Sequence, residues 1–215
     1  MSNIYITSDT HFGHANIAGP DISKWKEGYR NYKSVSDMNE DIIKNINKTV
    51  GYDDVLYHLG DWSFGGIENI WNFRKRVNCK EIHLILGNHD HHIEDDKLVL
   101  TDKGLQPAQE LFTSVQHYKE VKINGKMFVF SHYSHRIWHG SHKGWYHVYG
   151  HSHDSMDRNT PGYGKSMDGG IDSAIRILGS ARPFAVNEIT QILDKRGIEF
   201  VDHHNPNTDT GRMKK

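Results

Sequence analysis

The sequence contains little cysteine, no long apolar run and almost no net charge. Cys79 is the only cysteine in 215 residues, which excludes an intramolecular disulfide and a zinc site built from four thiolates. No run approaches the roughly 18 consecutive apolar residues that spanning a bilayer requires, and no basic segment precedes an apolar stretch near Met1. We therefore expect a protein of the reducing cytoplasm that is neither embedded in a membrane nor secreted.

The balance of charges excludes a global positive field as the means of recruiting a partner. The 26 lysines and arginines and the 27 aspartates and glutamates give a formal net charge of -1. A long nucleic acid is therefore a less expected partner, and any affinity for phosphate must come from a local site. The 36% hydrophobic content excludes disorder for most of the chain. We expect a single domain over residues 1–202 and a flexible polar tail over 203–215.

Short apolar runs alternate with amphipathic segments along the chain. Strands are predicted at 4–7, 55–59, 82–86, 118–123, 126–130 and 145–149. Helices are predicted at 36–50 with Ser36 as the N-cap, at about 66–77, near 95–103 and near 187–195, and further elements at 166–172 and 197–202. Asn124-Gly125 between two strand-like runs predicts a hairpin. The alternation predicts a layered α/β fold that binds ligands beyond the carboxyl ends of its strands.

Histidine is unusually abundant, with 17 residues, and many of them stand beside carboxylates where predicted strands end. Imidazole is a common metal ligand, so this abundance invites a search for a metal site. Five pieces follow strand ends in order: Asp9-x-His11, Gly60-Asp61, Gly87-Asn88-His89-Asp90, His132 and Gly150-His151-x-His153. Imidazole mixed with oxygen ligands suits divalent Mn, Fe, Ni, Co or Zn, and the lack of thiolate argues against Cu(I) or an iron–sulfur cluster.

These five pieces, in this order, resemble the calcineurin-like metallophosphoesterase family. The start Ser-Asp-Thr-His-Phe-Gly-His and the later Trp-His-Gly-Ser-His resemble its small bacterial and phage-encoded members. The resemblance implies a four-layer α/β/β/α sandwich and two divalent metal ions. It assigns one ion to Asp9, His11, Asp61 and His153, and the other to Asp61, Asn88, His132 and His151, so that Asp61 bridges the two.

The resemblance also implies a reaction. We expect hydrolysis of a small phosphodiester, with a nucleotide or cyclic nucleotide among the candidate substrates, by a hydroxide that bridges the two metals. His89 would protonate the leaving oxygen, and Asp90 would hold the His89 imidazole in the donating tautomer. A phosphomonoesterase, a nuclease and a non-catalytic interaction module of the same fold are the alternatives. The sequence leaves the oligomeric state open.

The segment 133–145 has two interpretations. It could bind phosphate through Arg136 and Lys143 and stack on a base through Trp138 and Trp145, or it could be a packed surface loop whose tryptophans bury apolar area. The basic and aromatic stretch at 24–30 has the same two interpretations.

Other polar residues near the pattern are less informative. His14 and Asn16 follow the first ligand pair and could touch the leaving group or cap a local helix. Cys79 is expected to be an inert buried thiol. Structural or simply exposed roles are expected for the remaining isolated histidines His83, His117, His203 and His204.

Overall fold

The computed structural model describes residues 2–21, 23, 30–159 and 163–202. Its first sheet has the strand order β11-β1-β2-β3-β6. The bounds are β1 Ile4–Thr7, β2 Val55–His58, β3 Glu81–Ile85, β6 Ser114–Gln116 and β11 Phe184–Ala185. The four strands β1, β2, β3 and β6 are parallel, and β11 pairs with β1 in the antiparallel direction. The carboxyl ends of the parallel strands therefore meet at one edge of the sheet.

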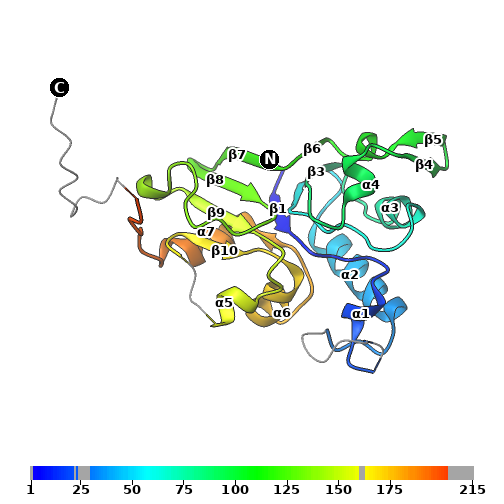
Figure 1. Ribbon diagram of the computed structural model, residues 1–215, viewed down its shortest axis with the longest axis horizontal. Coiled ribbons are helices and arrows are strands. Elements are labelled where there is room, and N and C mark those ends of the chain that lie inside the picture. Colours follow the sequence, from blue (N-terminus) through cyan, green and yellow to red (C-terminus); the bar gives the residue numbers. More distant parts are fainter. Residues whose placement is uncertain (1, 22, 24–29, 160–162, 203–215) are drawn as a thin grey trace.

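The second sheet has the order β10-β9-β8-β7 and lies on the left-hand side of Figure 1. Its strands are β7 Tyr118–Ile123, β8 Lys126–Ser131, β9 Tyr146–Tyr149 and β10 Ser166–Asp168. The strands β8, β9 and β10 are parallel, and β7 forms an antiparallel hairpin with β8. The turn between them has φ 49° at Asn124 and φ 81° at Gly125, as a tight hairpin turn of positive-φ residues requires. This hairpin confirms the prediction from Asn124-Gly125.

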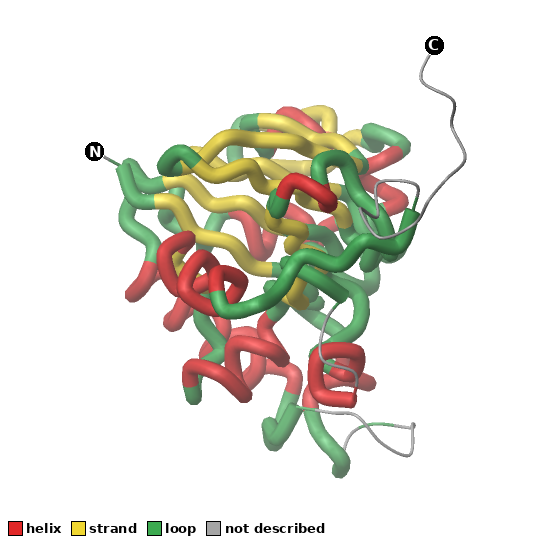
Figure 2. Tube along the Cα trace, turned by 90° about the vertical axis from the view of Figure 1, so that its left-hand side faces the viewer, coloured by secondary structure: helices red, strands yellow, loops and turns green. Residues whose placement is uncertain are grey.

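The two sheets face each other across a shared apolar cluster. Residues that alternate along the strands point into it from both sides, as Ile6 does from β1, Phe128 and Phe130 from β8, and Val148 from β9. The opposite face of the first sheet, with Leu56 and its neighbours, packs against the helices on the right-hand side of Figure 1. In Figure 2 the strands gather in the upper half of the view, with several helices below them. The expected α/β fold is confirmed.

The helices divide between the two clusters. Their bounds are α1 Ala15–Ala18, α2 Val35–Thr49, α3 Glu68–Arg74, α4 His91–Glu94, α5 Ser155–Asn159, α6 Ile171–Leu178 and α7 Val186–Asp194, with 3-10 turns η1 Ala108–Leu111 and η2 Ser141–Lys143. The helices α2 and α3 cover the first sheet, whereas α7 packs into the cluster between the sheets. The N-cap of α2 is Ser34, not Ser36, because the Ser34 hydroxyl accepts a hydrogen bond of 3.0 Å from the Asp37 amide.

The outer face of the second sheet is covered mainly by a loop and by the short helix α5. His147 and Tyr149 alternate with the inward residues of β9 and so point outward. The ring of Trp138, in the 133–145 segment, lies 5.2 Å from that of His147, and the Tyr149 hydroxyl donates to Asp157 on α5 at 3.2 Å.

Three predicted segments differ in the structure. The helix predicted near 95–103 is instead a hairpin of β4 Leu98–Thr101 and β5 Gly104–Pro107, because exposed and buried residues alternate along β4 as a strand requires. The segment 166–172 divides into β10 and the start of α6, and 197–202 forms neither helix nor strand. The predicted tail at 203–215 lies outside the described residues.

None of the described helices has the length and apolar character needed to cross a membrane.

Candidate metal centre

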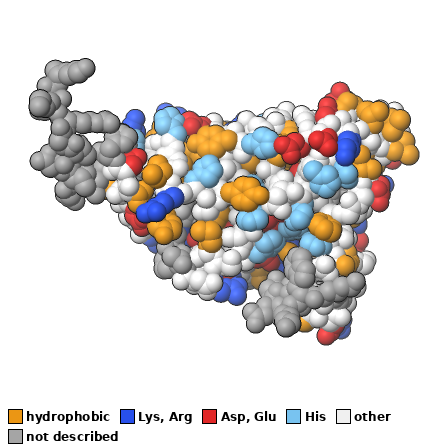
Figure 3. Space-filling view, viewed as in Figure 1, with side chains coloured by type: hydrophobic (Ala, Val, Ile, Leu, Met, Phe, Trp, Pro, Cys, Tyr) orange, Lys and Arg blue, Asp and Glu red, His pale blue; other side chains and the backbone are white. Residues whose placement is uncertain are grey.

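The five sequence pieces meet where strands of both sheets end. Asp9, Asp61 and Asn88 follow the parallel strands β1, β2 and β3, and His132 and His151 follow β8 and β9 of the other sheet. Figure 3 shows histidine side chains, in pale blue, gathered across the centre of one face of the molecule. The candidate ligand atoms form two groups of three, which we call cluster A and cluster B.

Cluster A consists of Asp9, His11 and His153, whose ligand atoms all lie within 4.8 Å of one another. The Asp9 Oδ1 atom is 3.8 Å from the Nε2 atoms of both His11 and His153. Asp9 and His11 are buried, and His153 is half-buried.

Cluster B consists of Asp61, His132 and His151. The Asp61 Oδ2 atom lies 3.6 Å from His132 Nε2. The side-chain oxygen of Asn88 lies 3.0 Å from His132 Nε2 and 2.9 Å from His151 Nδ1. Asn88 therefore adds a neutral oxygen to this group.

Asp61 is a member of cluster B and also faces cluster A. Its Oδ2 atom is 3.4 Å from His11 Nε2 and 3.6 Å from His132 Nε2, while its Oδ1 atom accepts a hydrogen bond of 2.9 Å from the His89 amide. One carboxylate oxygen is thus anchored to the backbone and the other faces a histidine of each cluster. This is the arrangement that a bridging ligand needs.

The histidine nitrogens that face the clusters are placed to bind a metal cation, because the other ring nitrogen of His132 and of His153 already has a hydrogen-bond partner. His132 Nδ1 lies 2.8 Å from the Leu59 carbonyl and His153 Nδ1 lies 2.8 Å from Asp172, so each Nδ1 can donate to that oxygen while Nε2 faces the cluster. Burial and the neighbouring His153 lower the pKa of His11 well below its ordinary value. The buried His11 Nε2 has no hydrogen-bond partner among the described residues.

The spacing of the donor atoms agrees with this fit. Metal–ligand bonds of about 2.0–2.2 Å place two ligands of one cation roughly 3–4 Å apart. Asp61 lies 3.4 Å from His11 and 3.6 Å from His132, Asn88 lies 2.9 Å from His151, and Asp9 lies 3.8 Å from both histidines of cluster A.

Backbone conformation brings these side chains together at some energetic cost. The residues Asp9, His11, Asp61, His151 and His153 all have positive φ, between 46° and 62°. Such conformations cost of the order of 1–3 kcal/mol each and persist only where the surroundings enforce them. Two glycines allow the close approach, because a Cβ at Gly60 would collide with the His132 ring and one at Gly87 would collide with the Asp61 carboxylate.

A buried ion pair behind cluster A was not predicted from the sequence. The Arg30 guanidinium donates to both oxygens of Asp172, at 3.0 and 2.8 Å, and also to the carbonyl oxygens of Asp9 and Thr10. Burial alone would raise the pKa of Asp172, but the charges of Arg30 and His153 hold it far below its ordinary value. Burial lowers the pKa of His153, but the hydrogen bond to Asp172 and the charge of Asp9 outweigh it and raise the pKa to about 9.

The expected role of Asp90 is wrong. Its two oxygens accept hydrogen bonds from the backbone amides of Asp61, Trp62 and Gly87, at 2.8, 2.9 and 2.8 Å. No hydrogen bond joins Asp90 to the ring of His89, although the structure describes both residues. Asp90 is buried, and its hydrogen bonds fix the backbone of the turns that carry Asp61 and Asn88 and do not hold the His89 ring.

The ring of His89 lies beside cluster A. Its centroid is 5.4 Å from that of His11 and 5.0 Å from that of Phe64. His14 is buried next to the same group, stacks on Phe64 at 3.7 Å, and has its Nδ1 atom 3.3 Å from that of His11. His14 occupies the N-cap position of α1, but its side chain makes no capping hydrogen bond. Of its two interpretations, proximity to the centre therefore has the stronger support.

The 133–145 segment packs mainly against itself and the second sheet. Trp138 is buried, its Nε1 donates to the Trp145 carbonyl at 3.0 Å, and a Cβ at Gly140 would collide with the Trp145 ring. Arg136 and Lys143 are exposed. Of the second basic stretch, 24–29 lies outside the described residues.

The residues expected to be inert have ordinary structural contacts. Cys79 is buried, and burial raises the pKa of its thiol. His83 Nδ1 lies 2.7 Å from the Ser114 hydroxyl, and the exposed His117 pairs with Glu94 at 3.2 Å. His203 and His204 lie outside the described residues.

Comparisons with known proteins identify relatives of part of the chain. No family model matches it. An uncharacterised protein of Methanocaldococcus jannaschii is 39% identical over 92 residues, which are 42% of this chain and 48% of that protein. The gene 66 protein of Mycobacterium phage D29 is 34% identical over 94 residues, which are 42% of this chain and 41% of that protein. The matches thus span about half the length of these curated relatives or less.

One solved structure extends the likeness to most of the chain. A protein of unknown function from Aquifex aeolicus has a TM-score of 0.59 at 21% identity, over 89% of this chain and 100% of that chain. An archaeal phosphodiesterase has a TM-score of 0.43 at 17% identity, over 78% of this chain and 83% of that chain. The first of these likenesses shows a shared fold.

Proposed function

We propose that this protein is a dinuclear metal-dependent phosphoesterase that hydrolyses a phosphodiester. The observation that carries the proposal is the position of Asp61, whose Oδ2 atom faces His11 of cluster A at 3.4 Å and His132 of cluster B at 3.6 Å. Asp9, His11, Asp61 and His153 would hold one divalent cation. Asp61, Asn88, His132 and His151 would hold the other, and Mn, Fe, Ni, Co and Zn suit this donor set.

The proposal gives these residues two roles: some hold the metal ions, and one transfers a proton. Two divalent cations held by these residues would supply Lewis acidity, attract a phosphoester anion and lower the pKa of bound water. Asp90 fixes the backbone that carries Asp61, and Asp172 orients His153, so the ligand geometry is set by the protein in advance.

His89 is the proton donor of the proposal. Its backbone amide holds Asp61 Oδ1 and its ring lies beside His11, so the imidazole borders the centre and is not part of either ligand cluster. A general acid at that position would protonate the leaving oxygen of the ester. Phe64 packs edge-on against the ring and restricts its orientation.

The test is hydrolysis of bis(p-nitrophenyl) phosphate and p-nitrophenyl phosphate by metal-stripped protein reloaded with Mn, Ni, Zn or Mg. Release of nitrophenol that depends on metal and is lost in Asp61→Asn supports the proposal, and the ratio of the two rates ranks diester against monoester hydrolysis. His117→Asn is the matched control, because His117 is an exposed histidine paired with Glu94 outside both clusters. A folded protein that carries two ions and hydrolyses neither ester with any metal would favour the non-catalytic interaction module.

A further inference from the structure

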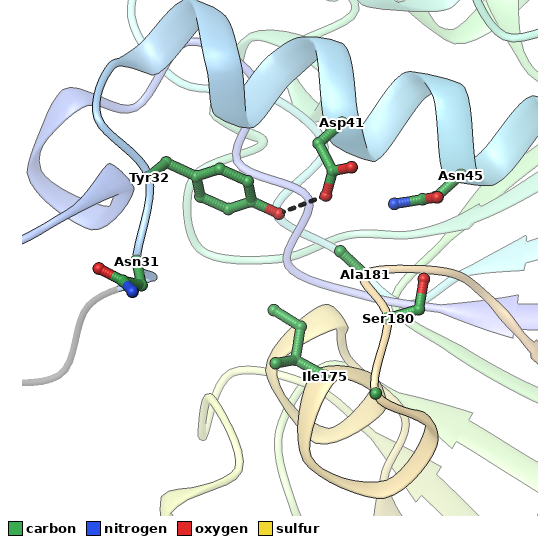
Figure 4. Close-up of a pocket in the computed structure, with 8 residues that line it drawn as sticks. Asn31, Tyr32, Asp41, Asn45, Ile175, Ser180 and Ala181 are labelled. Atoms are coloured by element: carbon green, nitrogen blue, oxygen red, sulfur yellow. Dashed lines mark hydrogen bonds between the residues drawn. The ribbon is translucent and has the colours of Figure 1, made fainter.

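Carboxylates outside the two clusters differ in what they hold in place. Asp41 lies in a pocket of about 370 Å³ between α2 and the loop after α6, and it accepts a hydrogen bond of 2.7 Å from the Tyr32 hydroxyl (Figure 4). Asp168 is 0% exposed and lies where β10 ends, beside the end of β9. The turn that follows β9 carries His151 and His153, so of these two carboxylates it is Asp168 that borders the metal centre.

The turn 150–154 carries one ligand of each cluster. His151 belongs to cluster B, and His153, two residues later, belongs to cluster A. A shift of this turn would therefore move a ligand of both clusters at once. Asp9 adds a further link, because its Oδ2 atom accepts a hydrogen bond of 2.9 Å from the His151 amide. The geometry of both clusters thus depends on how this turn is held.

The backbone of the 150–154 turn needs support from outside. His151, His153 and Asp154 have φ angles of 62°, 46° and 65°. Positive φ is uncommon for residues that carry a side chain, and it persists only where the surroundings enforce it. Because three such residues stand within four positions, the conformation of this turn must be imposed by neighbouring groups.

Asp168 provides this support from the end of β10. Its Oδ2 atom accepts hydrogen bonds from the Ser152 hydroxyl at 2.5 Å and from the Asp154 amide at 3.0 Å. Its Oδ1 atom accepts a hydrogen bond of 2.7 Å from the Gly170 amide, just before α6. Ser152 and Asp154 are the neighbours of His153 in the chain, so a single carboxylate oxygen holds the residues on both sides of that ligand.

A second carboxylate ties the end of the turn to α6. The buried Asp154 side chain accepts hydrogen bonds from the Arg176 guanidinium, at 2.5 and 2.7 Å, and from the Ser173 hydroxyl at 2.9 Å. These bonds act on the last residue of the turn. Asp168 also holds Ser152, which lies between the two ligands, so its carboxylate is the group best placed to fix both of them.

We propose that Asp168 is a positioning residue for both metal ions: its carboxylate fixes the 150–154 turn and thereby sets where His151 and His153 place their donor nitrogens. The inference rests on the proposed two-metal centre and adds to it a residue that acts on both clusters through one turn. Asp172 differs, because the ligand histidine that it hydrogen-bonds is His153 of cluster A. Substitution of Asp168 should therefore weaken the binding of both ions, and substitution of Asp172 the binding of one.

The test is a calorimetric titration of metal-stripped protein with Mn²⁺. In Asp168→Ala both binding steps should weaken by about tenfold or more, as is typical when a group that orients metal ligands is lost. Asp157→Ala is the matched control: the Asp157 side chain is 1% exposed and accepts hydrogen bonds of 3.2 Å from the Asp168 amide and the Tyr149 hydroxyl, outside the turn. It should leave both steps within about twofold. Weakening of a single step in Asp168→Ala, or equal weakening in the two variants, would overturn the proposal.

A spectroscopic measurement separates positioning from a loss of stability. The visible absorption of bound Co²⁺ depends on the arrangement of its ligands, so at saturating Co²⁺ the spectrum of Asp168→Ala should differ from that of the native protein, and that of Asp157→Ala should not. An unchanged spectrum at full occupancy would contradict the positioning role. Ser152→Ala removes one of the two bonds between Asp168 and the turn, and it replaces Asp168→Ala if that variant does not fold. It should weaken both steps by several-fold, and unchanged binding would overturn the proposal.

These measurements do not depend on hydrolysis, so the two proposals can fail separately. Weakening of both binding steps with a changed cobalt spectrum, in a protein that hydrolyses neither nitrophenyl ester, would retain the role of Asp168 and reject the phosphoesterase. Metal-dependent hydrolysis by the native protein, with binding and spectrum unchanged in Asp168→Ala, would overturn the role of Asp168 and leave the phosphoesterase standing.

Discussion

Clusters A and B have similar ligand atoms, but they differ in the exposure of one histidine and in the groups that hydrogen-bond the histidines from behind. In cluster A, Asp9 and His11 are 0% and 2% exposed, and His153 is backed by a carboxylate that is itself paired with the buried Arg30. In cluster B, His151 is exposed, and His132 is backed by a neutral carbonyl. A carboxylate partner makes an imidazole a more basic ligand than a carbonyl does. From this difference we expect cluster A to hold a cation more tightly than cluster B, and a cation in cluster B to exchange more readily.

The largest effect is expected where the two clusters meet. Asp61→Asn replaces the anionic oxygen that faces both His11 and His132 by a neutral amide. We expect activity to fall by at least about 10³-fold, because several kcal/mol of charge stabilisation by the cations depend on this ligand. Metal analysis of the purified variant should show fewer than two ions per chain. Full occupancy with full activity would mean that the clusters do not share Asp61.

Loss of the proton donor should reduce turnover without changing metal content. His89→Asn removes the ring beside His11 and leaves its backbone amide on Asp61. We expect kcat to fall by about 10²-fold or more, with two ions still bound. The reduction should be smaller for a nitrophenyl ester than for an alkyl ester, because nitrophenolate needs less protonation. Equal losses for both esters would contradict an acid role.

Asp172→Asn gives His153 of cluster A a neutral hydrogen-bond partner, which is the kind of partner that His132 of cluster B already has. The asparagine can still accept from His153 Nδ1, but as a neutral oxygen like the Leu59 carbonyl behind His132. We expect the tighter of two metal-binding steps in a calorimetric titration to weaken by about 10- to 100-fold, while the weaker step stays unchanged. Glu120→Gln is the control, since Glu120 pairs with His139 on the surface at 2.9 Å.

Folding and metal binding must be separated in this variant. Asp172→Asn leaves the buried Arg30 without its partner, and breaking a buried ion pair costs about 3–5 kcal/mol. The double variant Arg30→Met with Asp172→Asn removes both charges and should recover much of the lost thermal stability. Metal affinity should stay weak in the double variant. If affinity returns together with stability, the pair has only a structural role.

The sequence predicted the fold where the pattern is local. The runs at 4–7, 55–59 and 82–86 became β1, β2 and β3 because each is apolar and bounded by polar residues. The strands β6 and β11 have three and two residues, and they form only because β3 and β1 offer edges to pair with. The segment 95–103, which contains β4, was predicted to be a helix because neighbouring leucines fit either period over so short a segment.

The site was predictable to the extent that its ligands stand in recognisable blocks. Blocks of histidine and carboxylate marked the seven expected ligands, and the structure brings them into one region. The partner of Arg30 lies 142 positions away in the sequence, so no local pattern could pair it with Asp172. The role of Asp90 was misjudged because adjacency in sequence suggested contact with His89, whereas the turn directs the carboxylate at backbone amides.

The smallest expected effect concerns the order in which the two metal ions leave. Two members of each cluster are buried, but the third is exposed in cluster B, where it is His151, and half-buried in cluster A, where it is His153, so a chelator should reach cluster B more easily. Limited treatment of the loaded protein with EDTA should therefore remove one ion several-fold faster than the other. The slow step should become faster in Asp172→Asn, since that variant weakens only cluster A. Release of both ions at one rate in both proteins would mean that exposure and the Asp172 carboxylate do not set the difference between the clusters.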